Sequence, residues 1–166
     1  MSISFRSRAL QAAGFVFLAF LPMTAQPDKA LAPLPGSEYS GMYSFLRDGE
    51  FVQVSVEDHG SVIGFVSRYA NQEGDSGFLD HFFKSGKLDG NHLAFTTEAM
   101  GGVAFEFRGT VERGEGKSRD DEAYYVLEGT LVENTTDEAK KTSSRSSEVA
   151  LKSFPQDMAP PQAEKK

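Results

Sequence analysis

The sequence predicts an all-β protein: an N-terminal signal peptide, then an up-and-down antiparallel meander of about eight strands closed into a barrel. Between residues 41 and 154, short runs with apolar residues at every second position are each followed by a turn signal. No stretch of useful length repeats its apolar residues with the 3.6-residue period of a helix. Short connections favour pairing of consecutive strands, and eight strands suffice for a twisted sheet to close on itself.

The first 32 residues have the features of a removable signal peptide. Arg6 and Arg8 precede a near-continuous apolar stretch over residues 10–21, which is too short to span a bilayer comfortably. Cleavage is expected after Ala25 or after Ala32, and an uncleaved N-terminal anchor is the alternative. Cleavage implies an exported protein, periplasmic or extracellular, with no stable membrane insertion.

Composition excludes several classes of function. The formal charge is −7, so nucleic acid and anionic lipid are not expected as partners. The chain has no cysteine, which excludes a thiol nucleophile, a thiolate metal site and a disulfide. About 135 residues remain after the signal peptide, enough for one domain with a single core.

The first three strands are predicted from turns and alternation. A strand over residues 41–46 ends at the Asp-Gly turn of residues 48–49. Residues 52–57 show the clearest alternation in the chain, with valine at every second position and polar residues between. The turn of residues 58–60 leads into a strand over residues 61–68.

The middle of the chain holds the least certain segment. After a polar loop over residues 70–77, residues 78–88 suit a strand, although their beginning could also form one helical turn. Asp89-Gly90 is a strong hairpin signal and leads into an alternating strand over residues 92–97.

Two further strands surround a charged loop. After the turn at residues 101–102, alternation over 103–112 points the apolar residues, Phe105 and Phe107 among them, to one face. A charged, mobile loop over 113–123 precedes a strand over 125–131.

The remaining segments have few apolar residues. Residues 134–147 are predicted to be a disordered excursion or a short helix around residues 138–141, before an eighth strand over residues 149–153. The Pro- and Gly-rich residues 33–40 are interpreted as a linker to a barrel domain over 41–154, and residues 155–166 as a disordered tail.

The layout resembles the calycin barrels, the group of avidins and lipocalins, across residues 41–154. The resemblance rests on the Gly-x-aromatic opening of the first strand, Gly41-Met42-Tyr43, on the eight-strand meander and on the secreted location. Members of these families usually carry Gly-x-Trp, whereas this chain has no tryptophan, so biotin binding is not expected. The resemblance implies a cup-shaped barrel that holds one small apolar molecule.

The sequence contains no complete motif for catalysis or metal binding. Gly116-Lys117-Ser118 lacks the earlier glycine of a phosphate loop, since that position is Val111. His81 and His92 flank their own hairpin about 17 Å apart, too far to share an ion, and His81 is interpreted as a solvated surface residue. No serine elbow is present. We therefore predict a protein that is not an enzyme and needs no metal or other cofactor.

The aromatic residues are the feature with most functional potential. If the barrel contains a cavity, its wall is predicted to be Tyr43, Val54, Phe65, Phe95, Phe105, Phe107, Tyr125 and Leu127. The leading prediction is an exported, non-enzymatic barrel that binds a small apolar or amphipathic molecule. The alternative is an exported structural or protein-interaction domain whose core is filled by these side chains. The identity of any protein partner stays open.

Overall fold

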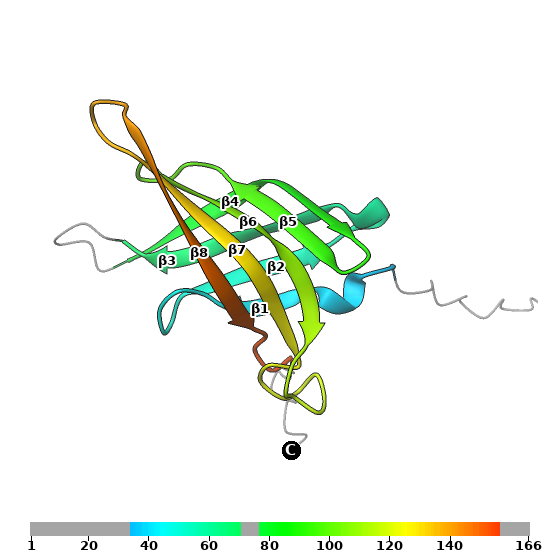
Figure 1. Cartoon of the computed structure of the whole chain (residues 1–166). Coiled ribbons are helices and arrows are strands. Elements are labelled where there is room, and N and C mark those ends of the chain that lie inside the picture. The colour runs from blue at the N-terminus through cyan, green and yellow to red at the C-terminus, as the bar shows by residue number, and fades with distance from the viewer. Residues whose placement is uncertain (1–33, 71–76, 157–166) are drawn as a thin grey trace, which may run out of the picture. The chain divides into compact units, whose positions relative to one another are not determined.

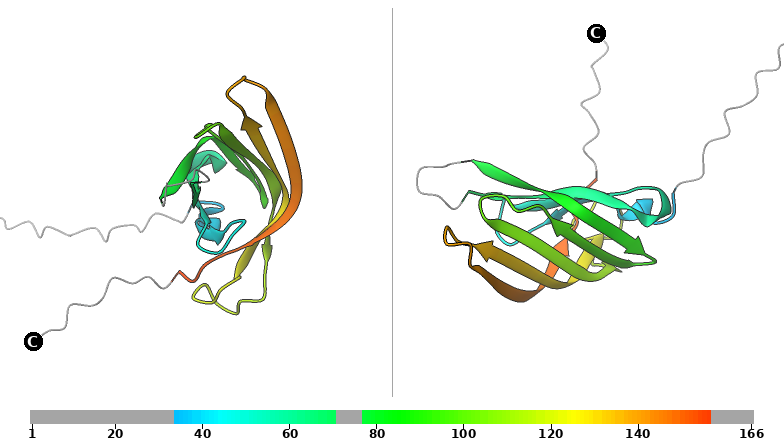
Figure 2. Two further views of the ribbon diagram at one scale, coloured as in Figure 1. Left: turned by 90° about the vertical axis from the view of Figure 1, so that its left-hand side faces the viewer. Right: turned by 90° about the horizontal axis from the view of Figure 1, so that it is seen from above.

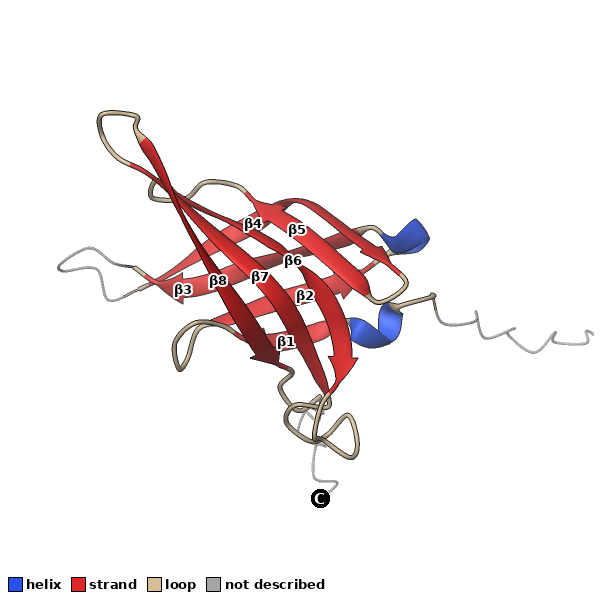
Figure 3. Cartoon of the chain, in the orientation of Figure 1, coloured by secondary structure: helices blue, strands red, loops and turns tan. Residues whose placement is uncertain are grey.

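Eight antiparallel strands follow one another in chain order, each hydrogen-bonded to the next, which confirms the predicted meander (Figures 1 and 3). The computed structural model describes residues 34–70 and 77–156. The predicted signal peptide, most of the polar loop after residue 70 and most of the C-terminal tail lie outside the described residues. The elements are η1 (Ser37–Tyr39), β1 (Gly41–Ser44), β2 (Phe51–Val56), η2 (Asp58–Gly60), β3 (Val62–Tyr69), β4 (Phe78–Asp89), β5 (His92–Thr97), β6 (Val103–Arg113), β7 (Tyr125–Thr136) and β8 (Thr142–Lys152).

Two uncertain segments are resolved as strands. Residues 78–89 form β4 throughout, so the helical alternative does not apply. The prediction of disorder or a helix within 134–147 is wrong, because β7 continues to Thr136 and β8 already begins at Thr142. The two strands pair in an unbroken register from Val126↔Lys152 to Thr136↔Thr142. Backbone pairing with a neighbour, rather than an apolar face, makes this Ser-rich segment a strand.

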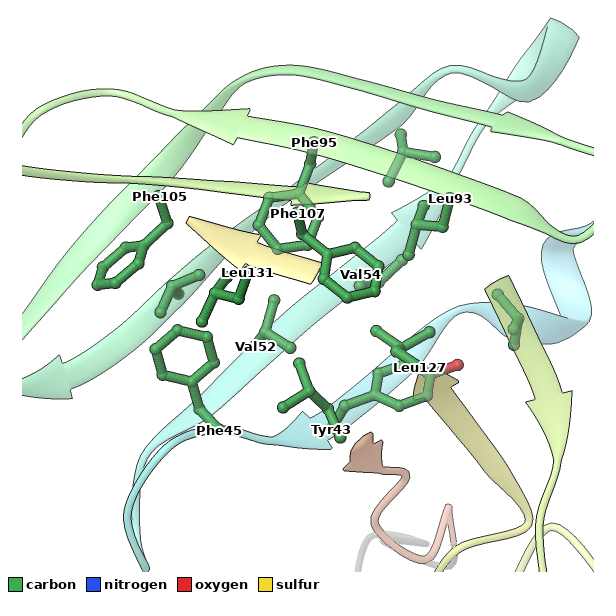
Figure 4. Packing of buried hydrophobic residues seen from close by; sticks show 14 of the residues in the cluster. Tyr43, Phe45, Val52, Val54, Leu93, Phe95, Phe105, Phe107, Leu127 and Leu131 are labelled. Atoms are coloured by element: carbon green, nitrogen blue, oxygen red, sulfur yellow. The ribbon is translucent and has the colours of Figure 1, made fainter. Parts of the chain in front are cut away.

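The interior is formed by the alternating apolar positions that the sequence indicates (Figure 4). Val52, Val54, Val56, Phe105 and Phe107 are at most 7% exposed, which confirms the predicted strand parity. The rings of Phe95 and Phe107 stack with centroids 5.4 Å apart, and Phe45 meets Phe105 edge-on at 5.3 Å. Aromatic side chains therefore fill the inside of the curled sheet.

A pair of glycines lets β6 and β7 curve around this core. Gly109 and Gly129 lie directly opposite each other. A Cβ at Gly129 would lie 2.3 Å from the Arg108 carbonyl oxygen, and one at Gly109 would lie 2.7 Å from Cζ of Phe107. The missing side chains thus leave room for the neighbouring backbone and for the Phe107 ring.

The sheet curls into a half-barrel whose edge strands meet only at one end (Figure 2). Tyr43 of β1 bridges Ser153, and the Phe154 N–H donates to the Met42 carbonyl at 2.8 Å. β1 has only four residues, so the earlier part of β8 pairs with β7 alone. Closure is therefore partial, and a gap, here called the seam, separates β8 from the loop that follows β1.

The segment interpreted as a linker makes contacts with the barrel. Within its described part, η1 places the Tyr39 ring edge-on to Tyr125, with centroids 5.1 Å apart. The buried Tyr43 hydroxyl donates a hydrogen bond to the Tyr39 carbonyl at 2.6 Å. Residues 37–39 therefore cover the end of the sheet where β1 and β8 meet.

Candidate functional site

Six of the eight residues predicted to line a cavity lie together inside the sheet. Their exposures are between 0% and 2%, and their side chains pack on one another (Figure 4). They are Tyr43, Val54, Phe95, Phe105, Phe107 and Leu127. In this structure they form the packed core of the half-barrel.

The other two predicted wall residues lie elsewhere. Phe65 lies on the outer face of β3, so the prediction that it faces inward is wrong. Its partners across the sheet are Gln53 and Phe82, whereas its chain neighbour Val66 is fully buried. Gly64 takes the inward position opposite the buried Val54, and a Cβ there would meet the Gln53 backbone. Tyr125 is half-buried at the covered end of the sheet.

The seam contains a pocket of about 220 Å³, here called the seam pocket. Its lining residues come from the β1–β2 loop and from the inward-facing positions of β7 and β8, and they are Leu46, Leu131, Glu133, Arg145 and Ser147. The pocket exists because β1 ends at Ser44, which leaves β8 paired only with β7 at Arg145 and Ser147. The lining thus combines two leucines, one on the loop and one on β7, with charged groups and a hydroxyl.

The β1–β2 loop that carries Leu46 is held by a buried carboxylate. Glu50, 2% exposed, pairs with Arg47 at 2.7 Å and accepts a hydrogen bond from the Tyr69 N–H at 3.2 Å. The Phe45 N–H also donates to the Glu50 carbonyl at 3.0 Å. These bonds tie the loop to β3 and place the Leu46 side chain at the seam.

An ion pair connects the pocket to the interior. Arg68 of β3 is 8% exposed and donates to the Glu133 carboxylate at 3.2 Å. The Arg68 guanidinium also lies 5.4 Å from the centroid of the Phe105 ring. On the neighbouring strand β8, Arg145 is the cross-strand partner of Glu133 and also lines the seam pocket. Two arginines thus flank one glutamate.

His81 of β4 is buried next to this ion pair, which contradicts its interpretation as a solvated surface residue. It is 1% exposed, lies opposite Val66, and meets the Phe105 ring edge-on at 5.2 Å. Neither ring nitrogen makes a hydrogen bond of normal geometry. Burial and the Arg68 charge lower the pKa of His81, outweighing the opposite effects of Val103, Asp80 and Glu133. The imidazole is therefore neutral at pH 7.

The buried imidazole predicts acid sensitivity. Because the pKa of His81 is below its ordinary value of 6.5, the unfolded chain binds more protons than the folded one below that pH. Folding stability should therefore be complete above pH 6.5 and fall as the pH drops, by at most about 1.4 kcal/mol per pH unit from this group. Urea unfolding of the wild type and His81→Phe between pH 7.5 and 5 measures this loss. His81→Phe should lose less stability than the wild type over this pH range, whereas His92→Phe, at an exposed position, should lose as much as the wild type. Equal losses in all three proteins would contradict the assignment of the acid sensitivity to His81.

Larger hollows exist, but they are open to solvent. One of them, about 770 Å³, lies along β4, β5 and β6, and its lining includes the exposed side chains of Lys87, Arg108 and Glu128. Charged groups in such a depression stay hydrated and offer little selectivity. The seam pocket is smaller but more enclosed, and its lining residue Glu133 is paired with the buried Arg68, so it is the better candidate.

The stretch that resembles a phosphate loop makes hydrogen bonds within its own loop. The Lys117 and Ser118 amides of the phosphate-loop-like stretch both donate to the Asp121 carboxylate, at 2.8 and 2.9 Å. Within residues 34–70 and 77–156, no three His, Cys, Asp or Glu side chains are placed to hold a metal ion. No helix among these residues is long and apolar enough to cross a membrane.

Sequence reasoning missed the seam pocket and the buried polar residues beside it. Arg68 and His81 could have been found only by placing them on the inward face of β3 and β4, where alternation is ambiguous. No protein-family model, curated protein or solved structure matches this chain. The candidate site therefore rests on its geometry alone.

Proposed function

We propose that this protein is an exported, non-enzymatic binding protein that holds one small amphipathic molecule in the seam pocket. The observation that carries the proposal is the enclosed pocket of about 220 Å³, whose lining combines two leucines with charged groups and a hydroxyl. This volume is below the ~300–1,000 Å³ of sites for drug-sized ligands, which favours a small molecule. The layout resemblance to calycin barrels agrees with ligand binding, but the proposed site is at the seam and not inside the barrel.

Two serines of β8 provide a matched test. Ser147 lines the seam pocket, whereas its neighbour Ser146 is exposed on the opposite face of the same strand. Ser147→Trp should fill the pocket, and Ser146→Trp should leave it open. Native mass spectrometry of protein purified from its own source should show a bound small molecule in the wild type and in Ser146→Trp, but not in Ser147→Trp. A bound molecule that persists in Ser147→Trp, or none in any sample, would contradict the proposal.

Export is part of the proposal and has its own test. The arginines and apolar stretch of residues 1–32 support a mature chain that begins at Gln26 or Pro33. Intact mass of the secreted product should correspond to one of these two starts. A soluble chain that still carries Met1 or Ser2 would contradict export by this route.

A second candidate, a protein-interaction domain with a filled core, is favoured by an apolar outer surface over β3 and β4. Phe82, Phe78 and Ile63 are 49–56% exposed there. The Phe82 ring lies 5.6 Å from Phe65, which lies 5.8 Å from Phe51. Exposed apolar patches of this kind often mark interaction sites. A photo-crosslinking residue at position 82 should capture a protein in the native cell if this candidate holds, whereas one at position 108 on β6 should not.

A further inference from the structure

We propose that the seam pocket recognises an anionic group, so that its ligand is an amphipathic acid: a carboxylate on a small apolar body. This inference rests on the proposed function and names the chemical class of its ligand. It concerns the gap between β8 and the β1–β2 loop, where the lining residues differ from those of the barrel interior.

The local charge favours an anion although the chain as a whole is acidic. The formal charge of the chain is −7, yet Arg68 and Arg145 flank the single carboxylate of Glu133. Arg68 is paired with Glu133, and the Arg145 side chain has no ion pair or hydrogen bond within the described part of the chain. The Arg145 guanidinium is therefore available to bind a ligand, and a guanidinium is well suited to bidentate binding of a carboxylate.

The first arginine can exchange one carboxylate for another. Glu133 is about a quarter exposed, whereas Arg68 is nearly buried. A ligand carboxylate that enters through the seam can replace Glu133 on Arg68, while Glu133 turns toward solvent or toward Arg145 opposite it. The buried guanidinium stays paired throughout, which avoids the cost of an uncompensated charge.

His81 supplies the second observation. A buried imidazole whose nitrogens make no hydrogen bond of normal geometry is costly, because each such nitrogen has lost its water. The His81 ring and the Arg68 guanidinium lie 5.2 and 5.4 Å from the centroid of the same Phe105 ring, and Arg68 is paired with Glu133. A neutral imidazole offers one donor and one acceptor, so it can donate to an oxygen of a carboxylate held by Arg68. An acid bound here would give His81 a hydrogen bond of normal geometry, which the protein itself does not supply.

The remaining walls fit an apolar body. Leu46 is 45% exposed on the loop, and Leu131 is buried behind the pocket. An alkyl chain lying between them would cover Leu46, which is otherwise exposed to water. The Ser147 hydroxyl and the Arg145 head remain at the open side.

A matched pair of probes tests the inference directly. Octanoate and octanamide share an alkyl chain and differ mainly in the charge of the head group. In calorimetric titrations of the mature full-length protein at pH 7.5, octanoate should bind at least about tenfold more tightly than octanamide. Ser147→Trp should abolish binding of both probes.

Two variants assign the head-group contacts, and one serves as a control. Arg145→Gln should weaken octanoate binding about fivefold or more and leave octanamide unchanged. Glu133→Gln removes the competing carboxylate from Arg68, so it should tighten octanoate binding several-fold. Arg108→Gln, exposed on β6, should change neither probe. Circular dichroism melting confirms that each variant is folded.

The other outcomes separate the two proposals. Equal binding of octanoate and octanamide, both lost in Ser147→Trp, would overturn the inference and leave the proposed function intact. An octanoate affinity that is unchanged in both Arg145→Gln and Glu133→Gln would mean that the acid binds elsewhere. This result would also overturn the inference. No binding of octanoate overturns the inference as well, and the native mass spectrum of the purified protein then decides the proposed function separately.

Discussion

Replacing Phe107 with alanine should lower the free energy of unfolding by about 3–5 kcal/mol. Phe107 is fully buried, stacks on Phe95 and fills the space above Gly109. Its removal loses buried apolar area and leaves a cavity that the surrounding strands, tied by continuous pairing, can close only in part.

The neighbouring residue is the control for this experiment. Arg108 is exposed on the outer face of β6, so Arg108→Ala should change the unfolding free energy by no more than about 0.5 kcal/mol. Urea unfolding of both variants, followed by circular dichroism, measures the difference. Equal costs at the two positions would mean that the inward face of β6 is assigned incorrectly.

A methyl group at Gly129 should destabilise the fold by at least about 2 kcal/mol. The new Cβ would lie 2.3 Å from the Arg108 carbonyl oxygen and 2.5 Å from the Cα of Gly109. Both neighbours are backbone atoms of β6, so relief requires the two central strands to move apart and weakens their hydrogen bonds.

Gly77 provides the matched substitution. A Cβ there meets nothing within 4 Å, and the residue is exposed at the start of β4. Gly77→Ala should therefore stay within about 0.5 kcal/mol of the wild type in thermal or urea unfolding. A Gly129→Ala variant as stable as Gly77→Ala would refute the close approach of β6 and β7.

The class, order and parity of the strands could be predicted because they depend on local signals. The valines of β2 and the phenylalanines of β6 alternate strictly and are all buried, whereas Val103 and Gly109, predicted to share the inward face of β6, are half-buried. Turn residues between successive strands specify an in-order meander. These features require only the two-residue period of a strand and short connections.

The structure differs from the sequence predictions where the placement of a residue depends on a neighbouring strand. Residues 142–148 are exposed and polar, so nothing in their own pattern indicates β8, and only the ladder with β7 orders them. On β3 and β4, Phe65 and Phe82 face outward while His81 faces inward, against the hydrophobicity of these residues. Register decided these positions because a shift of one residue exchanges the faces of a strand.

By itself the sequence determined that an all-β meander forms and which residues of β2, β6 and β7 make its core. Only the tertiary structure decided that the core side chains fill the interior and that β1 and β8 contact each other only near Tyr43 and Ser153. It also decided which polar residues lie together beside the seam: Arg68, His81, Glu133 and Arg145. The physical reason is that alternation is encoded within a few residues, whereas the curl of the sheet and the unequal lengths of β1 and β8 depend on all eight strands together.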